Sequence, residues 1–264
     1  MDHDIEHSEP SPSADQDRRL RRLRWYNLVM GFFHAAQGVA VLALANNFAL
    51  PVTATFMTNR PGAEPPALRQ LFDVRIAWGV AAFLFLSALA HWLIASPGIF
   101  EWYRRNLLRN RNYARWIEYS LSSSVMIVLI ALITGISEVA ALGALFGVNA
   151  AMILFGLLQE HYEDPGRPRW LSFLFGCLAG AVPWILIALY LWSPGVAASP
   201  PAFVYGIFFS LFIFFNIFAL NLVLQYRQVG KWRDYLYGEV VYVFLSLTAK
   251  SLLAWQVFAG TLAP

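Results

Sequence analysis

Charged side chains are scarce in this chain. Only 13% of its 264 residues are Asp, Glu, Lys or Arg, whereas 58% are hydrophobic. A soluble domain carries about 25% charged residues. Because so few charges cannot cover a globule of this size in water, the surplus apolar side chains are expected to face lipid. The composition excludes an ordinary soluble domain and predicts an integral membrane protein.

Cysteine is also nearly absent, since Cys177 is the single one. One cysteine excludes an internal disulfide and a cysteine-ligated metal cluster, so we expect no metal site. A cleavable signal peptide is not indicated, because the first 17 residues are acidic and polar and the apolar run after them is long. We predict a disordered cytoplasmic tail over residues 1–17 and a membrane domain over residues 18–264.

Seven apolar runs are long enough to cross a bilayer, which takes about 20 helical residues. The predicted fold is therefore all-α, a bundle of seven transmembrane helices. The third and fourth runs nearly touch, so a single turn must join them as an antiparallel pair. The predicted spans are Trp25–Phe48, Phe72–Ile94, Tyr113–Ile136, Glu138–Leu158, Trp170–Trp192, Ala202–Gln225 and Trp232–Gly260.

Positive charges are distributed unevenly between the two ends of these spans. On the N-terminal side lie five Lys or Arg before the first span, five in the second loop, two in the fourth and three in the sixth, against three on the other side. Because cytoplasmic loops are enriched in Lys and Arg, we expect the N-terminus inside and the C-terminus outside. The second loop, Pro97–Arg115, is expected to lie on an anionic membrane surface. The first, about residues 49–71, is long enough for structure of its own.

Lys250 is the remaining cation, and it lies deep in the last span, in SLTAKSLLAWQVF. A lysine at the membrane centre costs roughly 2.5–3.5 kcal/mol on insertion scales. An acid must pair with it, or it must stay neutral, or it must be consumed in a covalent bond. A desolvated neutral amine is nucleophilic and forms an imine with an aldehyde. The alternatives are a buried ion pair and a lysine on a transport path.

Glu118, in RWIEYSLSSS on the third span, is the natural partner of Lys250. It lies about one turn deeper in the membrane than Arg115, and Ser122, four residues on, shares its face. A carboxylate at this depth favours a protonated imine by charge attraction. The alternative is an interfacial glutamate paired with Arg115.

Two histidines within spans have polar companions on their own helix faces. His34 shares a stripe with Asn27 and Gln37, and His91 lies one turn after Ser87. A lone helical histidine is more often a satisfied polar residue than a functional one. Two of them with polar neighbours suggest a hydrated cavity that accepts protons.

The last span carries two further polar residues on the face of Lys250. Ser246, one turn earlier, is placed to hydrogen-bond the imine, and Glu239, three turns earlier, is interpreted as an interfacial group. Glycines four residues apart permit close helix approach, either inside the bundle or in a homodimer. These pairs are Gly143/Gly147 and Gly176/Gly180.

Three segments together resemble the heliorhodopsins: RWIEYSLSSSVMIVLI, FGVNAAMILFG and SLTAKSLLAWQVFAGTL. The resemblance runs from about Trp25 to Pro264, and the predicted cytoplasmic N-terminus agrees with the inverted topology of that family. It implies all-trans retinal on Lys250 as a protonated Schiff base, with Glu118 as counterion. Further cofactor contacts implied are Ser246, Ser122, Ser123, Phe215, Met152 and Trp255. A proton-accepting polar cavity is implied at His34, His91, Ser87, Gln37, Asn112 and Asn149.

The resemblance implies a light sensor in the cell membrane rather than an enzyme. Its expected partners are retinal, the lipid bilayer, a second copy in a homodimer and a cytoplasmic signalling partner, with no nucleic acid. The alternative is a light-driven proton or ion transporter. Ordinary proton pumps carry carboxylates one turn before the retinal lysine and three turns beyond the counterion, where this chain has Ser246 and Leu129. A third possibility is a seven-helix receptor in which Lys250 is merely paired.

Overall fold

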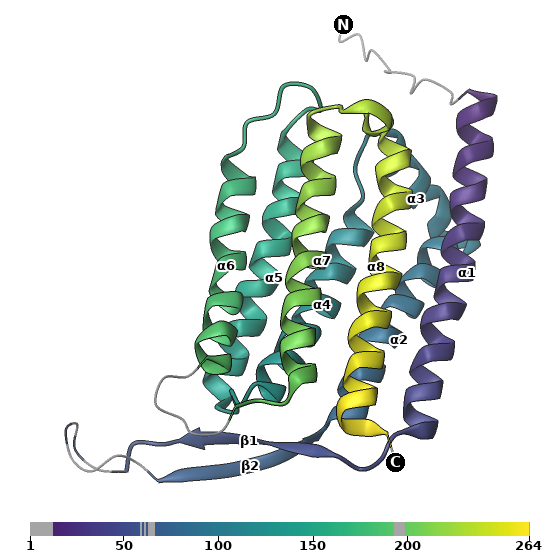
Figure 1. The fold of residues 1–264 in the computed structure, drawn as a ribbon. Helices are drawn as coiled ribbons and strands as arrows, with labels where there is room; N and C mark the ends of the chain where they lie inside the picture. Colours follow the sequence, from purple (N-terminus) through teal and green to yellow (C-terminus); the bar gives the residue numbers. More distant parts are fainter. Residues whose placement is uncertain (1–12, 59, 61, 63–66, 193–198, 264) are drawn as a thin grey trace, which may run out of the picture.

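Seven long apolar helices stand side by side in a bundle (Figure 1). The computed structural model describes residues 13–58, 60, 62, 67–192 and 199–263. Within these ranges the predicted seven-helix all-α fold is confirmed. The helices are α1 Ala14–Leu44, α2 Ile76–Ala95, α4 Tyr113–Ile133, α5 Val139–Tyr162, α6 Leu171–Leu191, α7 Ala202–Tyr226 and α8 Tyr235–Val257, which a π turn over Phe258–Leu262 continues.

A two-stranded hairpin fills the long first loop. Strands β1 (Ala49–Thr55) and β2 (Leu68–Arg75) pair antiparallel and lie across the end of the bundle opposite the start of α1 (Figure 1). The Thr53 backbone N–H donates to the Ser137 carbonyl at 2.8 Å, which ties the hairpin to the turn between α4 and α5. The expectation of structure in this loop is confirmed. The predicted start of the second span at Phe72 is wrong, because Phe72 pairs with Val52 in the hairpin.

The first helix begins eleven residues earlier than predicted. The Ser13 hydroxyl accepts from the Gln16 backbone N–H at 3.2 Å, and the Gln16 side chain accepts from the Ser13 N–H at 3.0 Å. This capping box starts α1 at Ala14. Residues 13–17 are therefore a helix cap and first turn, not a disordered tail. The rest of the predicted tail, residues 1–12, lies outside the described residues.

A short helix, α3 (Pro97–Leu108), packs on the basic first turns of α1. Leu20 and Leu23 of α1 are buried against Phe100, Tyr103 and Leu107 of α3. Arg104 donates to the Asp17 carboxylate at 2.5 Å, and this hydrogen bond raises the pKa of the Arg104 guanidinium. The arginine-rich start of α1 thus continues as helix because α3 covers its apolar stripe.

The helices differ in how much of their surface the bundle covers. α2, α4 and α8 are half or more buried over their most apolar stretch, whereas α5 is only 17% buried. Large apolar side chains on α6, such as Leu178 at 69% exposed and Ile185 at 65%, point away from the protein. Such outward apolar surface fits lipid as the surrounding medium.

Glycines let α5 and α6 approach their neighbours closely. A Cβ at Gly156 would overlap the Trp116 ring, and one at Gly180 would press on the Met152 sulfur. The predicted close approach at Gly176/Gly180 is thus used inside the bundle. At Gly143 and Gly147 the described part of the chain places nothing within 4 Å of such a Cβ, so that pair serves no internal packing there.

Candidate functional site

Lys250 lies inside the bundle with its side chain only 5% exposed. Its Nζ is 3.2 Å from Glu118 Oε1 on α4 and donates to Ser246 Oγ at 2.9 Å, one turn earlier on α8. Glu118 accepts a second hydrogen bond of 2.6 Å from Ser87 Oγ on α2. Helices α2, α4 and α8 therefore bring together Ser87, Glu118, Ser246 and the Lys250 amine. The sequence pattern had grouped Ser246 with Lys250, and Ser87 with His91.

The alternative pairing of Glu118 with Arg115 does not occur in the described structure. Arg115 lies one turn earlier on α4 and pairs with Glu160 of α5 and Glu239 of α8. Arg115 thus pairs with two carboxylates, and neither of them is Glu118. Glu118 therefore pairs with Lys250 and not with Arg115.

An apolar cavity of about 320 Å³ adjoins Lys250 between α4, α5, α6, α7 and α8. Trp184 forms its aromatic wall with Phe212 and Phe215, each ring centroid 5.4 Å away at a steep angle. Lys250 is the sole charged side chain among the described residues that line it. A buried amine opening into aromatic walls fits a hydrophobic conjugated aldehyde such as retinal.

The residues expected to contact the cofactor divide into three groups. Ser123, Met152, Phe215 and Ser246 line the cavity together with Lys250. Ser122 is fully buried one turn beyond Glu118 but does not line it. Trp255 is misplaced by the sequence prediction.

Trp255 faces away from the cavity. It is 40% exposed and donates from Nε1 to Gln37 Oε1 on α1 at 3.0 Å. Its ring lies on the face of α8 opposite the cavity lining, so Trp255 takes no part in this site. The sequence prediction missed Trp116 and Trp184, which the cavity lining includes. No helical spacing relates either tryptophan to Lys250, because both come from other helices.

The two predicted histidines meet beside the Lys250–Glu118 pair. The His34 and His91 rings stack with centroids 5.5 Å apart and 15° between their planes. His91 Nδ1 lies 2.7 Å from Asn27 Oδ1. His34 is fully buried, and neither of its ring nitrogens has a hydrogen-bond partner among the described residues. Such unpaired nitrogens fit a hydrated pocket.

The other residues expected in the polar cavity lie elsewhere. Asn149 donates to Ser123 Oγ at 2.8 Å and Ser124 Oγ at 3.0 Å, between α4 and α5. Gln37 faces Trp255, and Asn112 donates to Glu239. The single predicted cavity is therefore several separate polar contacts, of which only Ser87, His34 and His91 surround the Glu118 region.

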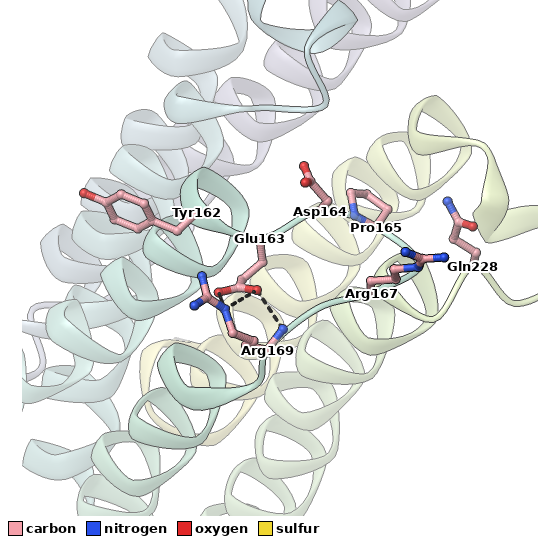
Figure 2. A pocket seen from close by; sticks show the side chains of 8 residues that line it. Tyr162, Glu163, Asp164, Pro165, Arg167, Arg169 and Gln228 are labelled. Carbon is pink, nitrogen blue, oxygen red and sulfur yellow. Dashed lines mark hydrogen bonds and ion pairs between the residues drawn. The ribbon is translucent and has the colours of Figure 1, made fainter.

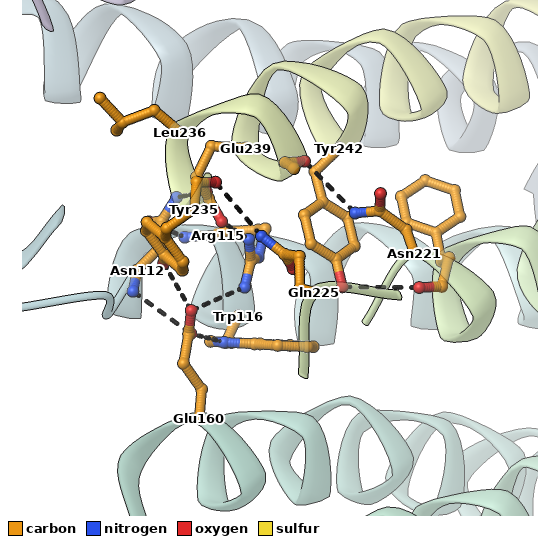
Figure 3. A network of polar contacts seen from close by, with 12 residues as sticks. Asn112, Arg115, Trp116, Glu160, Asn221, Gln225, Tyr235, Leu236, Glu239 and Tyr242 are labelled. Carbon is orange, nitrogen blue, oxygen red and sulfur yellow. Dashed lines mark hydrogen bonds and ion pairs between the residues drawn. The ribbon is translucent and has the colours of Figure 1, made fainter. Parts of the chain in front are cut away.

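A second buried polar cluster centres on Arg115 (Figure 3). Arg115 Nη2 contacts Glu160 Oε1 at 3.0 Å, and Nη1 contacts Glu239 Oε1. Tyr235 OH donates to Glu160 Oε1 at 2.5 Å. Glu239, interpreted from the sequence as an interfacial group, is buried inside the protein at 1% exposed. Sequence reasoning missed Glu160, because nothing in its own helix marks a carboxylate near the loop as buried.

A third polar region lies in the loop between α5 and α6 (Figure 2). Glu163 accepts from the Arg169 backbone N–H at 2.7 Å and from Arg169 Nε at 3.2 Å. This pair lines an open pocket with Asp164, Arg167 and Gln228. Over the described ranges, no group of three or more His, Cys, Asp or Glu side chains could hold a metal ion. The Lys250 cavity is therefore the candidate functional site.

Known proteins resemble the chain in both sequence and fold. A family model described as Heliorhodopsin matches residues 23–262. The rhodopsin of Exiguobacterium sibiricum aligns with TM-score 0.60 and 17% identity over 91% of this chain and 96% of its own. The proton-pumping rhodopsin AR2 of the marine alga Acetabularia acetabulum aligns with TM-score 0.60 and 15% identity over 94% and 96%. A comparison with curated proteins gave no match. At these identities the structural likeness establishes the fold alone.

Replacing Arg115 with Leu should destabilise the bundle strongly. The substitution leaves Glu160 and Glu239 buried without a cation, and breaking a buried ion pair costs about 3–5 kcal/mol. Unfolding by denaturant in a fixed detergent measures the loss. The exposed Arg105→Leu control on α3 should change stability by less than about 0.5 kcal/mol. Equal stability of the two variants would contradict the assigned role of Arg115.

Proposed function

The chain belongs to the heliorhodopsin family, and from this membership we propose that it senses light with all-trans retinal bound to Lys250 as a protonated Schiff base. The family itself implies a retinal-binding rhodopsin in a membrane. One observation carries the finer proposal: the buried Lys250 Nζ lies between the Glu118 carboxylate and an aromatic cavity.

The cavity residues bind and orient the chromophore. Trp184, Phe212 and Phe215 present flat apolar surface, and Met152 and Gly180 shape the side near α6. These walls exclude water from the polyene. Retinal bound there supplies absorption of visible light and isomerisation of its chain.

Glu118 holds the positive charge at Lys250 Nζ. Its carboxylate attracts the charge directly, and the hydrogen bond from Ser87 keeps that carboxylate oriented toward α8. Ser246 accepts from Nζ on the other side. The His34–His91 pair next to this site offers neutral imidazole nitrogens to a proton that leaves Nζ.

Signalling is favoured over proton pumping. Two of the structural neighbours, AR2 and the pump LR (Mac) of Leptosphaeria maculans, are named as proton pumps, but they share only 15% and 14% identity with this chain. Here Ser246 and the buried Leu129 stand where pumps carry carboxylates. Without those acids, the proton path that such pumps use has no relay in this chain.

The surroundings of the site fit a sensor in the cell membrane. The excess of Lys and Arg on the N-terminal side supports a cytoplasmic N-terminus. A slow photocycle would give a cytoplasmic partner time to bind the altered bundle surface. The outward apolar surfaces of α5 and α6 leave room for a homodimer within the bilayer.

Lys250→Ala should abolish visible colour after addition of all-trans retinal, because no amine remains to form the imine. The absorption spectrum of the purified protein, with and without retinal, measures this. Lys231→Ala, a matched change at an exposed lysine outside the spans, should keep full colour. Colour that survives in Lys250→Ala would rule out the attachment site.

Glu118→Gln should shift the absorption maximum and let the imine lose its proton at a lower pH. The reason is that the amide removes the negative charge that stabilises the protonated form. A spectroscopic pH titration of the retinal-bound protein reports both effects. The exposed Glu101→Gln serves as control and should titrate as the parent does. An unchanged titration in Glu118→Gln would exclude it as counterion.

Illuminated vesicles that contain the protein should show no sustained pH change, because the pump carboxylates are absent. A pH electrode with and without a protonophore measures this. A sustained, protonophore-sensitive change would instead establish transport.

A further inference from the structure

The Arg115 cluster carries an unbalanced buried charge. Arg115, Glu160 and Glu239 have side chains 4%, 2% and 1% exposed, so one guanidinium faces two carboxylates. The titratable neighbours that face the cluster are phenols from four helices: Tyr103 on α3, Tyr119 on α4, Tyr226 on α7, and Tyr235 and Tyr242 on α8. Neutral phenols leave a net charge of about −1 if both acids are ionised.

Asn112 fixes the ionisation state of Glu239. As the N-cap of α4, its Oδ1 accepts from the Arg115 backbone N–H at 3.0 Å. Its Nδ2 must therefore point the other way, and it donates to Glu239 Oε2 at 2.6 Å. Arg115 donates to the other oxygen. Each Glu239 oxygen accepts one hydrogen bond, which is the pattern expected of a carboxylate.

The two carboxylates differ in the number of hydrogen bonds that they accept. Glu160 accepts from four donors, two on each oxygen: Arg115 Nη2, the Tyr235 hydroxyl, Trp116 Nε1 and the Asn112 backbone N–H. Glu239 accepts from two. Because each donor stabilises the charged form, Glu239 is the acid that binds a proton more readily.

A row of polar side chains links this cluster to the histidines beside Lys250. His91 Nδ1 contacts Asn27 Oδ1 at 2.7 Å, and the Asn27 side chain lies beside the Tyr103 hydroxyl. Asn112 Nδ2 donates to the Tyr103 hydroxyl at 3.5 Å and to Glu239 Oε2 at 2.6 Å. Burial, and next the Glu239 charge, raise the pKa of Tyr103, so this phenol stays neutral.

Unpaired buried polar atoms mark both ends of the row. Within the described residues, Arg115 Nε at one end and both His34 ring nitrogens at the other have no hydrogen-bond partner. Buried polar atoms of this kind are commonly satisfied by internal water. Water at these places would complete a proton path between the two sites.

We propose that Glu239 is the group that finally binds the proton leaving Lys250 Nζ, a role that rests on the proposed function. The Nζ–H bond breaks with its electron pair kept on nitrogen, and an O–H bond forms at Glu239 Oε2. The Arg115 cluster changes from −1 to 0, while the Lys250–Glu118 site changes from 0 to −1. The total charge is conserved inside the protein, so the event stores a proton near the N-terminal end of the bundle without exporting one.

The first test needs no chromophore. Infrared spectra of the full-length Lys250→Ala protein in lipid nanodiscs are recorded as the pH is lowered, in the region of the protonated carboxyl C=O stretch. Glu239 should give a titrating band that is lost when Glu239→Gln is added and kept when Glu118→Gln is added. Glu160→Gln should move this band to lower pH, because Arg115 then faces a single carboxylate. Glu239→Asp should shift the band and not remove it. If the protein with Glu239→Gln keeps every titrating carboxyl band of the Lys250→Ala parent, the proposal is overturned.

The second test uses light. A light-minus-dark infrared spectrum of the retinal-bound protein should contain a new carboxyl C=O band that disappears in Glu239→Gln. Tyr103→Phe, which removes only the hydroxyl in the row, should keep the band but delay its appearance. A light-induced band unaffected by Glu239→Gln would contradict the proposal. If retinal gives no colour, the proposed function fails, whereas the titration without chromophore still decides whether Glu239 binds a proton.

Discussion

The contact between Lys250 and Glu118 is the interaction on which the interior of the bundle depends. Opposite charges 3.2 Å apart attract by about 5 kcal/mol at an effective dielectric constant of about 20. Most of that attraction offsets the desolvation of two buried ions, so the pair adds little net stability. Its consequence is positional, because α2, α4 and α8 must stay in register for Glu118 and Ser246 to contact the Lys250 amine and for Ser87 to hydrogen-bond Glu118.

The Arg115 cluster repeats this arrangement nearer the start of α1, with a different balance. There one guanidinium faces two carboxylates. Arg115 Cζ also lies 4.5 Å from the centroid of the Trp116 ring and 3.9 Å from that of the Tyr242 ring, which adds cation–π attraction. Trp116 and Tyr242 also line the cavity beside Lys250. The two polar sites therefore share walls, and a change in chromophore shape would press on side chains that contact Arg115.

Sequence patterns revealed what a single helix encodes. Lys250 stands out because a cation in mid-span needs an explanation, and Ser246 and Ser122 follow from helical spacing. Apart from the pairing of Lys250 with Glu118, contacts between helices were beyond such patterns. Glu160 and Glu239 meet only because α4, α5 and α8 converge at Arg115, and Trp255 was misassigned because its segment identifies α8 without saying which face meets the cavity. The early start of α1 was missed since its polar first turns are stabilised by α3.

The attachment of retinal to Lys250 is tested most directly by borohydride reduction followed by peptide mass spectrometry. Reduction converts an imine into a stable amine, so the peptide that contains Lys250 should gain the mass of one retinyl group after retinal is added. The account predicts that gain at Lys250 and none at Lys231. An unmodified Lys250 peptide from coloured, reduced protein would contradict it.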